Sequence, residues 1–340
     1  MSFVIIPALA SVGITGIAAE VIAFGIQMVA SSIISKVFAP DAPTNSQQSL
    51  PNPGNRQQLP PAGDNKLPVV YGTAYVGGII TDMSISSDNQ DIYWIFSLCE
   101  VTNTETGGTP DTITFGNIYW GGKRCIFGSN GAVTGLLDES TGETQDITGY
   151  MDIYLYSNGS ASPANSSLAA NVVMSNSNLI YKWDVSKLMS NCAFAIIHLK
   201  YNADKNLTGL NQTRFQVTNA RSAPGDCFLD YLTSSKYGAA IPLANINTSS
   251  LNALNTYSSQ SFTYTTYAGG TSTQARFTFN GSLDTNLKIM QNIQAMADCC
   301  DCLVRYDEIT GLWGVVVQSP TYTVAMDINN TNMIGAITVS

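Results

Sequence analysis

The densest group of residues that could do chemistry is Asp298–Cys302, with three cysteines and two aspartates in five positions. Thiolates and carboxylates bind metals, but zinc and iron–sulfur sites usually draw cysteines from two separated pairs. The other four of the seven cysteines stand apart from one another. A metal site or a disulfide at Cys299, Cys300 and Cys302 therefore stays an alternative, and the sequence favours buried free thiols.

The chain has one histidine, His198, inside the apolar stretch CAFAIIHLKY at 192–201. A Ser–His–Asp or Cys–His nucleophile system would have to use it, and a site with several histidine ligands in one chain is excluded. In an alternating strand His198 shares a face with Phe194, Ile196 and Lys200. We expect a histidine on a sheet surface or at an interface rather than a catalytic base.

The remaining motifs give no catalytic set. None of the Gly-Gly pairs is followed by the Lys-Ser/Thr of a phosphate loop, and none has dinucleotide-binding spacing. The carboxylates of Asp138, Glu139 and Glu143 could imitate a glycosidase pair, but their Gly/Ser/Thr-rich surroundings predict a solvated loop. The sequence therefore predicts a protein that is not an enzyme and needs no cofactor.

Charged residues make up 11% of the 340 positions, against about 25% in an average soluble protein. The polar surface must be mostly Ser, Thr, Asn and Gln, which suits a β-rich extracellular or virion protein that uses its surface for partners. The net charge of −9 is uneven: Asp82–Asp152 holds eleven acids and two bases, and the rest of the chain sums to zero. Such a segment lacks the clustered Lys and Arg that bind phosphates. It is either a solvated acidic face or a surface that repels DNA.

Residues 1–39 are almost entirely apolar, with Glu20 and Lys36 as the only formal charges. Phe3 to Ile34 is long enough to cross a bilayer, since about 20 apolar residues suffice. We expect this segment to be helical, either as a membrane anchor or as an apolar helix docked inside an assembly. Residues 40–66 hold six of the thirteen prolines and predict an extended linker.

From residue 67 onward the pattern becomes that of β-strands. Apolar runs and alternation predict strands at 92–99, 112–122, 151–156, 192–201 and 215–218. Helices are predicted at 224–238 and from Asp284 to Cys299, followed by a hairpin over 303–318. The expected buried face of the second helix consists of Leu287, Ile289, Met290, Ile293 and Met296.

These elements predict a mainly β protein, built of β-barrel or β-sandwich domains with a few helices. The expected divisions are the apolar helical segment 1–39, the linker 40–66, a β-rich part at 67–220 and an α+β part at 221–340. A further β domain could be inserted at about 100–215, and the last part is expected to continue beyond the chain end.

Three ordered stretches together resemble one family, the tail-tip or baseplate hub proteins of long-tailed bacteriophages, typified by the tip attachment protein J of phage lambda. They are KLPVVYGTAYVGGIITD (66–82), APGDCFLDYLTSSKYGAAIP (223–242) and RFTFNGSLDTNLKIMQNIQAMADCCDCLVRYDEITGLWGVVV (276–317). Ala-Pro-Gly at 223–225 stands where the family more often has Asn-Pro-Ala. The matching residues are Pro68, Tyr71, Gly72, Gly77 and Gly78; Asp230, Tyr231, Leu232, Tyr237 and Gly238; and Phe279, Asn280, Gly281, Asp284 and Trp313.

The resemblance implies a homotrimer with β-barrel hub domains that closes the distal end of the tail tube in the virion. Its implied partners are other tail-tip and distal tail proteins, the tape-measure protein, and a host-binding fibre or receptor-binding protein at the host surface. DNA would pass without specific binding, and residues 1–39 could contact the host membrane. The alternative is a membrane-anchored or secreted β-rich adhesin, which explains the apolar segment but not the three ordered stretches.

Overall fold

The computed structural model describes residues 58–59, 65–105, 108–159, 178–181 and 188–318. The apolar segment Phe3 to Ile34, most of the linker and residues 319–340 lie outside this part. No helix in the described ranges is long and apolar enough to cross a membrane.

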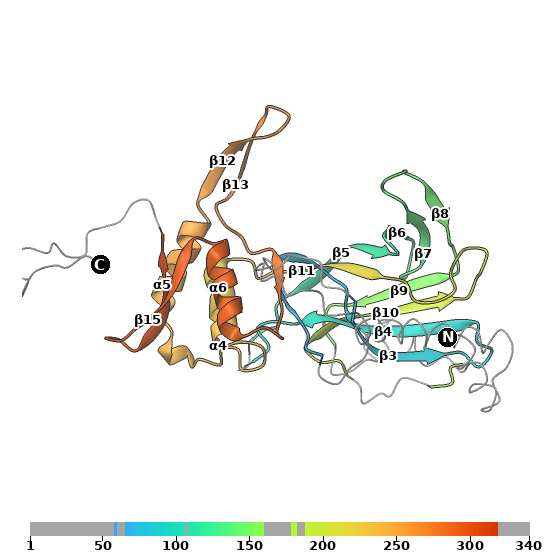
Figure 1. Cartoon of the computed structure of the whole chain (residues 1–340), viewed down its shortest axis with the longest axis horizontal. Coiled ribbons are helices and arrows are strands. Elements are labelled where there is room, and N and C mark those ends of the chain that lie inside the picture. Colours follow the sequence, from blue (N-terminus) through green and yellow to red (C-terminus); the bar gives the residue numbers. More distant parts are fainter. Residues whose placement is uncertain (1–57, 60–64, 106–107, 160–177, 182–187, 319–340) are drawn as a thin grey trace, which may run out of the picture.

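Two six-stranded sheets form the larger part of the structure (Figure 1). The first has the order β14-β1-β4-β10-β9, with β3 also on β4, and the second has the order β2-β11-β5-β6-β7-β8. The strands of the first sheet are β1 (Val69–Tyr71), β3 (Ile79–Ile85), β4 (Asp91–Glu100), β9 (Met151–Tyr156), β10 (Cys192–Lys200) and β14 (Gly281–Leu283). Those of the second are β2 (Thr73–Val76), β5 (Ile113–Trp120), β6 (Lys123–Phe127), β7 (Val133–Leu137), β8 (Thr144–Asp146) and β11 (Thr213–Asn219).

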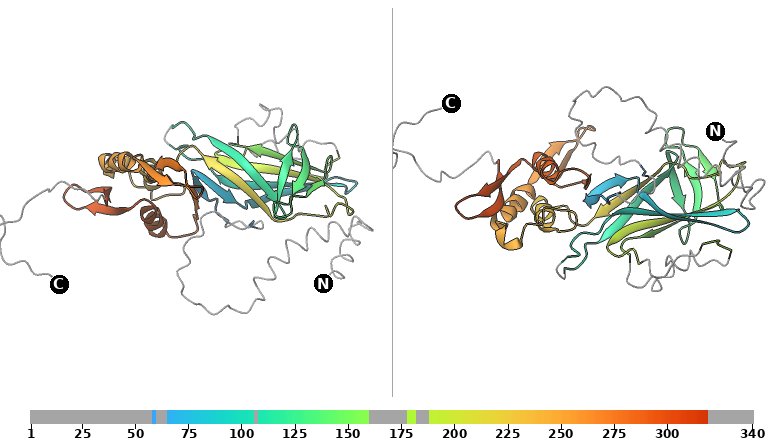
Figure 2. Two further views of the ribbon diagram at one scale, coloured as in Figure 1. Left: turned by 90° about the horizontal axis from the view of Figure 1, so that it is seen from above. Right: turned by 60° about the horizontal axis from the view of Figure 1, so that its bottom comes forward.

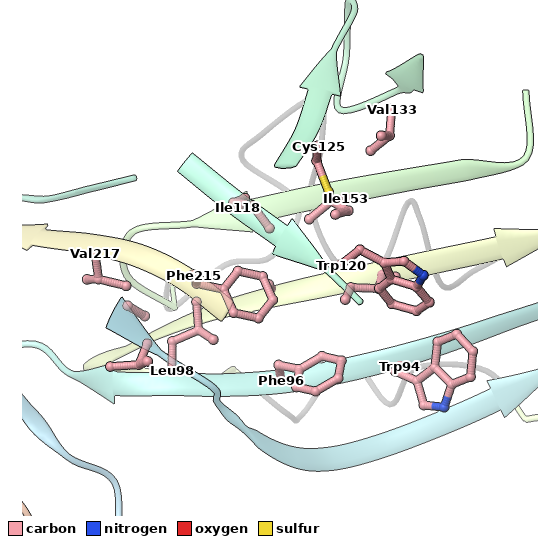
Figure 3. Packing of buried hydrophobic residues seen from close by; sticks show 14 of the residues in the cluster. Trp94, Phe96, Leu98, Ile118, Trp120, Cys125, Val133, Ile153, Phe215 and Val217 are labelled. Atoms are coloured by element: carbon pink, nitrogen blue, oxygen red, sulfur yellow. The ribbon is translucent and has the colours of Figure 1, made fainter. Parts of the chain in front are cut away.

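The two sheets pack face to face around one hydrophobic core. Alternate residues of β4 point inward from the first sheet, and the second sheet supplies facing aromatic residues from β5 and β11 (Figure 3). Trp94 lies 6.4 Å from Trp120, and Phe96 lies 5.9 Å from Phe215, between ring centroids. Neither sheet closes on itself within the described residues. The predicted mainly β class is confirmed as a sandwich, and the barrel alternative is wrong for this part.

The described strands between residues 100 and 215 contribute to the core of the sandwich. Strands β5, β6, β7, β9 and β10 contribute to the same core as β2 and β4, which extends from Val70 to Val217. Strands distant in sequence thus alternate between the two sheets of one sandwich.

The second part packs three helices with two hairpins (Figure 2). The helices are α4 (Pro224–Thr233), α5 (Thr248–Ser258) and α6 (Ile289–Cys299), with a short 3-10 turn η2 (Leu243–Asn245). The hairpins are β12 (Ser261–Thr265) with β13 (Thr271–Ala275), and β15 (Cys302–Asp307) with β16 (Leu312–Val317). The three helices and the hairpin β15–β16 share a core that includes Phe228, Leu254, Ile293 and Met296.

The strand β1 belongs to both cores. Successive side chains of a strand point to opposite faces. Val70 accordingly lies in the core of the sandwich, whereas Val69 and Tyr71 lie in the core of the helical part. One strand of three residues therefore joins the two parts of the molecule.

The two predicted helices are shorter than their sequence patterns indicate. Helix α4 ends at Thr233 because the Glu105 carboxylate accepts hydrogen bonds from the backbone N–H groups of Ser235 (2.8 Å) and Lys236 (2.9 Å). Helix α6 begins at Ile289, after a turn in which Asp284 accepts from the N–H of Asn286.

The buried face expected for α6 is correct only in part. Ile293 and Met296 are buried, but Leu287, Ile289 and Met290 are exposed. The polar Asn292 takes an inward position because its amide donates to the Tyr231 hydroxyl over 2.9 Å. Helix α6 begins five residues later than predicted, and the apolar residues at its start, Ile289 and Met290, are exposed to solvent.

The acidic segment Asp82–Asp152 is not one uniform face. Six of its eleven acids have basic partners, most of them from outside the segment. The pairs are Asp91 and Asp152 with His198, Glu100 with Lys236, Asp111 with Arg221, Glu139 with Arg124, and Asp146 with Lys205. The sequence count therefore overstates the free negative charge of this region.

Candidate functional site

The three stretches that carry the family resemblance meet at β1. Strand β14, from the third stretch, pairs antiparallel with β1, placing Tyr71 opposite Gly281 and Val69 opposite Leu283. The Thr285 hydroxyl then donates to the carbonyl of Leu67 over 2.8 Å. The second stretch reaches β1 through α4.

Asp230 on α4 lies at the centre of the contact between β1, α4 and β14, which we call the joint. Its Oδ2 accepts hydrogen bonds from the phenols of Tyr71 (2.7 Å) and Tyr237 (2.9 Å), and its Oδ1 accepts from the backbone N–H of Asn103 (3.3 Å). Burial raises the pKa of Asp230, and the hydrogen bonds from both phenols oppose that rise. Burial and the neighbouring carboxyl raise the pKa of Tyr71. Because both carboxylate oxygens are engaged by the chain itself, this cluster is built to hold segments together.

A second polar group supports the joint from the sandwich. Arg221 donates from Nε to Asp111 Oδ2 over 2.6 Å and from Nη2 to Oδ1 over 3.3 Å. The amide of Asn219 donates to the carbonyl of Val70 and to the hydroxyl of Thr102, both over 2.8 Å. Sequence reasoning missed these residues because each lies far along the chain from its partners and in no local pattern.

Two of the glycines that match the family motifs, Gly72 and Gly238, stand where neighbouring backbone leaves no room for a side chain. A Cβ atom on Gly72 would lie 1.9 Å from the carbonyl oxygen of Phe279, and one on Gly238 would lie 1.9 Å from that of Tyr231. Gly72 also has φ of +60°, which favours glycine. Next to it, the Asn280 side chain accepts from the N–H of Thr73 over 3.0 Å. These residues therefore bring the first and third stretches into direct contact.

The other family-type residues support the surrounding elements. Pro68 is buried and its carbonyl accepts from the N–H of Glu100. Gly77 and Gly78 lie between β2 and β3, where Gly78 has φ of +75° and packs on Leu98. Leu232 is in the core of the helical part, whereas the carbonyl of Asp284 accepts from Asn292. Trp313 on β16 lies 5.2 Å from Tyr306 and accepts at its carbonyl from the N–H of Asn247.

The cysteine cluster consists of free thiols in the structure. Cys300 and Cys302 are buried with their Sγ atoms 3.6 Å apart, and Cys299 is exposed. The hydrogen bond with Cys302, together with burial, raises the pKa of Cys300. Within the described ranges, no group of three or more His, Cys, Asp or Glu side chains is arranged to hold a metal ion.

His198 is held between two carboxylates on the face of the first sheet that points away from the sandwich core. Its Nε2 lies 2.7 Å from Asp91 Oδ1 on β4, and its Nδ1 lies 2.8 Å from Asp152 Oδ2 on β9. Its ring stacks on Tyr93 at 4.4 Å. Burial alone would lower the pKa of His198, but the hydrogen bonds and charges of both aspartates outweigh burial and raise it. With both ring nitrogens occupied, His198 links three strands.

Comparisons of this sequence and structure with known proteins do not identify a family. No protein-family model matches this sequence, and no curated protein matches it. Among solved structures, one chain of "Virion of native gene transfer agent (GTA) particle" is similar over 49% of this chain and 30% of that chain, with 12% identity and a TM-score of 0.28. This chain thus spans less than a third of that chain. A likeness this weak establishes neither a shared fold nor a shared function. The class that the structure itself defines is a β-sandwich joined to a small α+β part.

Proposed function

We propose that this chain is a structural hub protein of a long-tailed bacteriophage tail tip. The observation that carries the proposal is the meeting of the three family-like stretches around β1 and Asp230. If the three stretches resembled the family only by chance, their matching residues would lie at unrelated places in the fold. Here residues of the first stretch contact residues of both others, although Tyr71 and Asp230 are 159 positions apart and Thr73 and Asn280 are 207 apart.

The joint suits a mechanical role. Because β1 is packed into both cores, a displacement of the helical part is transmitted to the sandwich without a flexible linker between them. As a hub, three copies would close the distal tail tube and organise the host-attachment apparatus. Movement at the host surface would then release the tape-measure protein and DNA.

The expected partners follow from this role. They are two further copies of the chain, the other tail-tip and distal tail proteins, and a host-binding fibre or receptor-binding protein. DNA would pass transiently along a surface that offers few phosphate contacts. Residues 1–39 would either pack on the tube axis or enter the host membrane.

Electron microscopy of the native particle tests the proposal. An antibody against residues 65–159 should label the distal tail tip, and the reconstruction there should show threefold density that fits the sandwich. Deleting residues 1–39 should give particles that assemble but fail to inject if the segment contacts membrane, and no assembly if it docks. Particles that lack the chain, with the protein found instead on a cell surface, would overturn the hub and support an adhesin.

A further inference from the structure

The turn between α6 and β15 holds two buried thiols side by side. Cys300 follows the last residue of α6 and Cys302 begins β15, and their Sγ atoms lie 3.6 Å apart. Cys300 is fully buried, and Cys302 is 3% exposed. The sulfurs of a disulfide lie about 2.05 Å apart. To form that bond, these two sulfurs need to approach by about 1.5 Å, a movement that side-chain rotation can supply.

The fold fixes the backbone that carries the two thiols. Cys302 pairs with Val317 on the neighbouring strand β16. Asp301, between the two cysteines, has φ of +54°, a left-handed conformation that is uncommon for residues other than glycine. Its carbonyl accepts from the N–H of Gln318 over 3.0 Å. The close approach of the two sulfurs is therefore a property of the fold.

The two thiols differ in reactivity. The hydrogen bond with Cys300 lowers the pKa of Cys302, although burial opposes this effect. The same hydrogen bond and burial both raise the pKa of Cys300. The thiolate, rather than the thiol, is the nucleophilic form of cysteine. Cys302 is thus the sulfur that reacts first with an oxidant, and Cys300 is in contact with the sulfur that becomes oxidised.

The pair lies directly beneath the surface. Cys299, Asp301 and Leu303, which precede, separate and follow the two thiols in the chain, are exposed. Local opening of a protein occurs most readily where the surrounding residues are exposed, and it admits small solutes to buried groups. A small oxidant such as hydrogen peroxide therefore has a short path to the pair.

We propose that Cys300 and Cys302 are an oxidation site at which a peroxide forms a disulfide that closes the turn between α6 and β15. The Cys302 thiolate attacks one oxygen of hydrogen peroxide, the O–O bond breaks, and Cys302 becomes a sulfenic acid. The departing hydroxide takes up the proton that Cys302 had released and leaves as water. Cys300 then attacks the Cys302 sulfur, the S–O bond breaks, and the second oxygen leaves as water with the Cys300 proton. Two electrons thus pass from the two sulfurs to the peroxide.

The disulfide would stiffen the helical part of the molecule. Both cysteines lie in the core that also contains Val69 and Tyr71 of β1. A bond between cysteines one residue apart closes a small ring, and strained disulfides are the ones that thiols reduce readily. The site would therefore respond reversibly to oxidant and to reductant. This chemistry does not depend on the proposed tail-tip role, so the failure of either leaves the other standing.

Mass spectrometry of the oxidised chain tests the site. The full chain with Cys299→Ser is reduced, freed of reductant, treated with hydrogen peroxide in mild detergent, and then denatured with N-ethylmaleimide. Six of the seven cysteines remain in this variant, and we expect four to be labelled. The peptide with Cys300 and Cys302 should be lighter by about 2 Da for the two hydrogens lost. Dithiothreitol added before labelling should restore all the labels. Free thiols at both positions, or a disulfide between other cysteines, would overturn the proposal.

Two comparisons show whether the fold directs the oxidation. A second variant with Cys125→Ser as well, which removes a buried cysteine of the sandwich core, should form the same disulfide. In urea the same peroxide treatment should also oxidise the other cysteines, because burial no longer protects them. Oxidation of the native chain that is as unselective as in urea would contradict the site. Hydrogen exchange at residues 299–303 should slow after oxidation, and unchanged exchange would show that the disulfide does not close the turn.

Discussion

The phenol of Tyr71 donates a hydrogen bond to Asp230 over 2.7 Å, although 159 positions separate the two residues. Tyr71 lies on a strand of the sandwich sheet and Asp230 on the first helix of the α+β part. Tyr237 donates to the same carboxylate oxygen. One side chain thus holds β1, α4 and the turn that follows α4.

Replacing Asp230 with Ala should destabilise the protein strongly, because two buried phenols would lose their acceptor. Each unsatisfied buried group costs about 1–3 kcal/mol, so we expect a loss of about 2–6 kcal/mol for the two phenols. Tyr71→Phe removes one hydrogen bond and should cost about 1 kcal/mol. Urea denaturation of the full chain in mild detergent measures both. Tyr267→Phe, at a fully exposed position, is the control. An Asp230→Ala variant as stable as this control would contradict the role of the joint.

Replacing Gly72 with Ala should break the contact between the first and third stretches. The added methyl group would lie 1.9 Å from the Phe279 carbonyl oxygen, so the backbone must move. Gly142→Ala is a matched control, because Gly142 has φ of +76° with nothing within 4 Å of its Cβ position. The control should lose about 1–2 kcal/mol from backbone strain alone. Gly72→Ala should lose clearly more in the same denaturation measurement, and equal losses would contradict the packing argument.

Local patterns predicted the strands and the last hairpin well. Alternation or continuous apolar character marks β4, β9, β10 and β11, and all four appear within a few residues of the predicted ranges. The hairpin β12–β13 was missed because all but one of its strand residues are exposed. Helix α5 was missed because its narrow buried face of Leu251, Leu254 and Tyr257 lies among Ser, Thr and Asn residues. The early end of α4 could not be foreseen, since it depends on Glu105 from another part of the chain.

The joint itself was only partly predictable. The resemblance named Tyr71, Gly72, Asp230 and Tyr237, but it gave no reason for them to meet. Contacts with Asn103 and the supporting group around Arg221 arise only when distant segments fold together. His198 was predicted correctly to lie on a sheet surface. Its two carboxylate partners were not predicted, because they come from neighbouring strands.

The cysteines should react unequally with a thiol reagent. Only Cys299 is exposed, and the other six are buried as free thiols. Native protein should therefore label rapidly at one cysteine, and denatured protein without reductant should label at all seven. Five labels after denaturation would show that a disulfide such as Cys300–Cys302 had formed. Cys299→Ser should abolish the rapid labelling, and rapid labelling that persists would contradict the burial of the others.

Stability should depend on pH through His198. The folded state raises its pKa above the ordinary value of 6.5, because Asp152 and Asp91 stabilise the imidazolium more than burial destabilises it. The folded protein therefore holds the proton more tightly than the unfolded chain does. The resulting stability is fully present below the unfolded pKa near 6.5 and is lost as pH rises through the higher folded pKa.

The free energy of unfolding of the wild type should accordingly fall, relative to His198→Gln, as pH rises from about 6 to 9. Because His198 is the only histidine, its NMR signal reports the folded pKa without ambiguity. Asp152→Asn and Asp91→Asn should each lower that pKa, since each removes one of the two carboxylates that contact the ring. Asp138→Asn, an acid hydrogen-bonded to Ser140, is the control and should leave the signal unchanged. A folded pKa at or below 6.5 would show that burial outweighs the two aspartates.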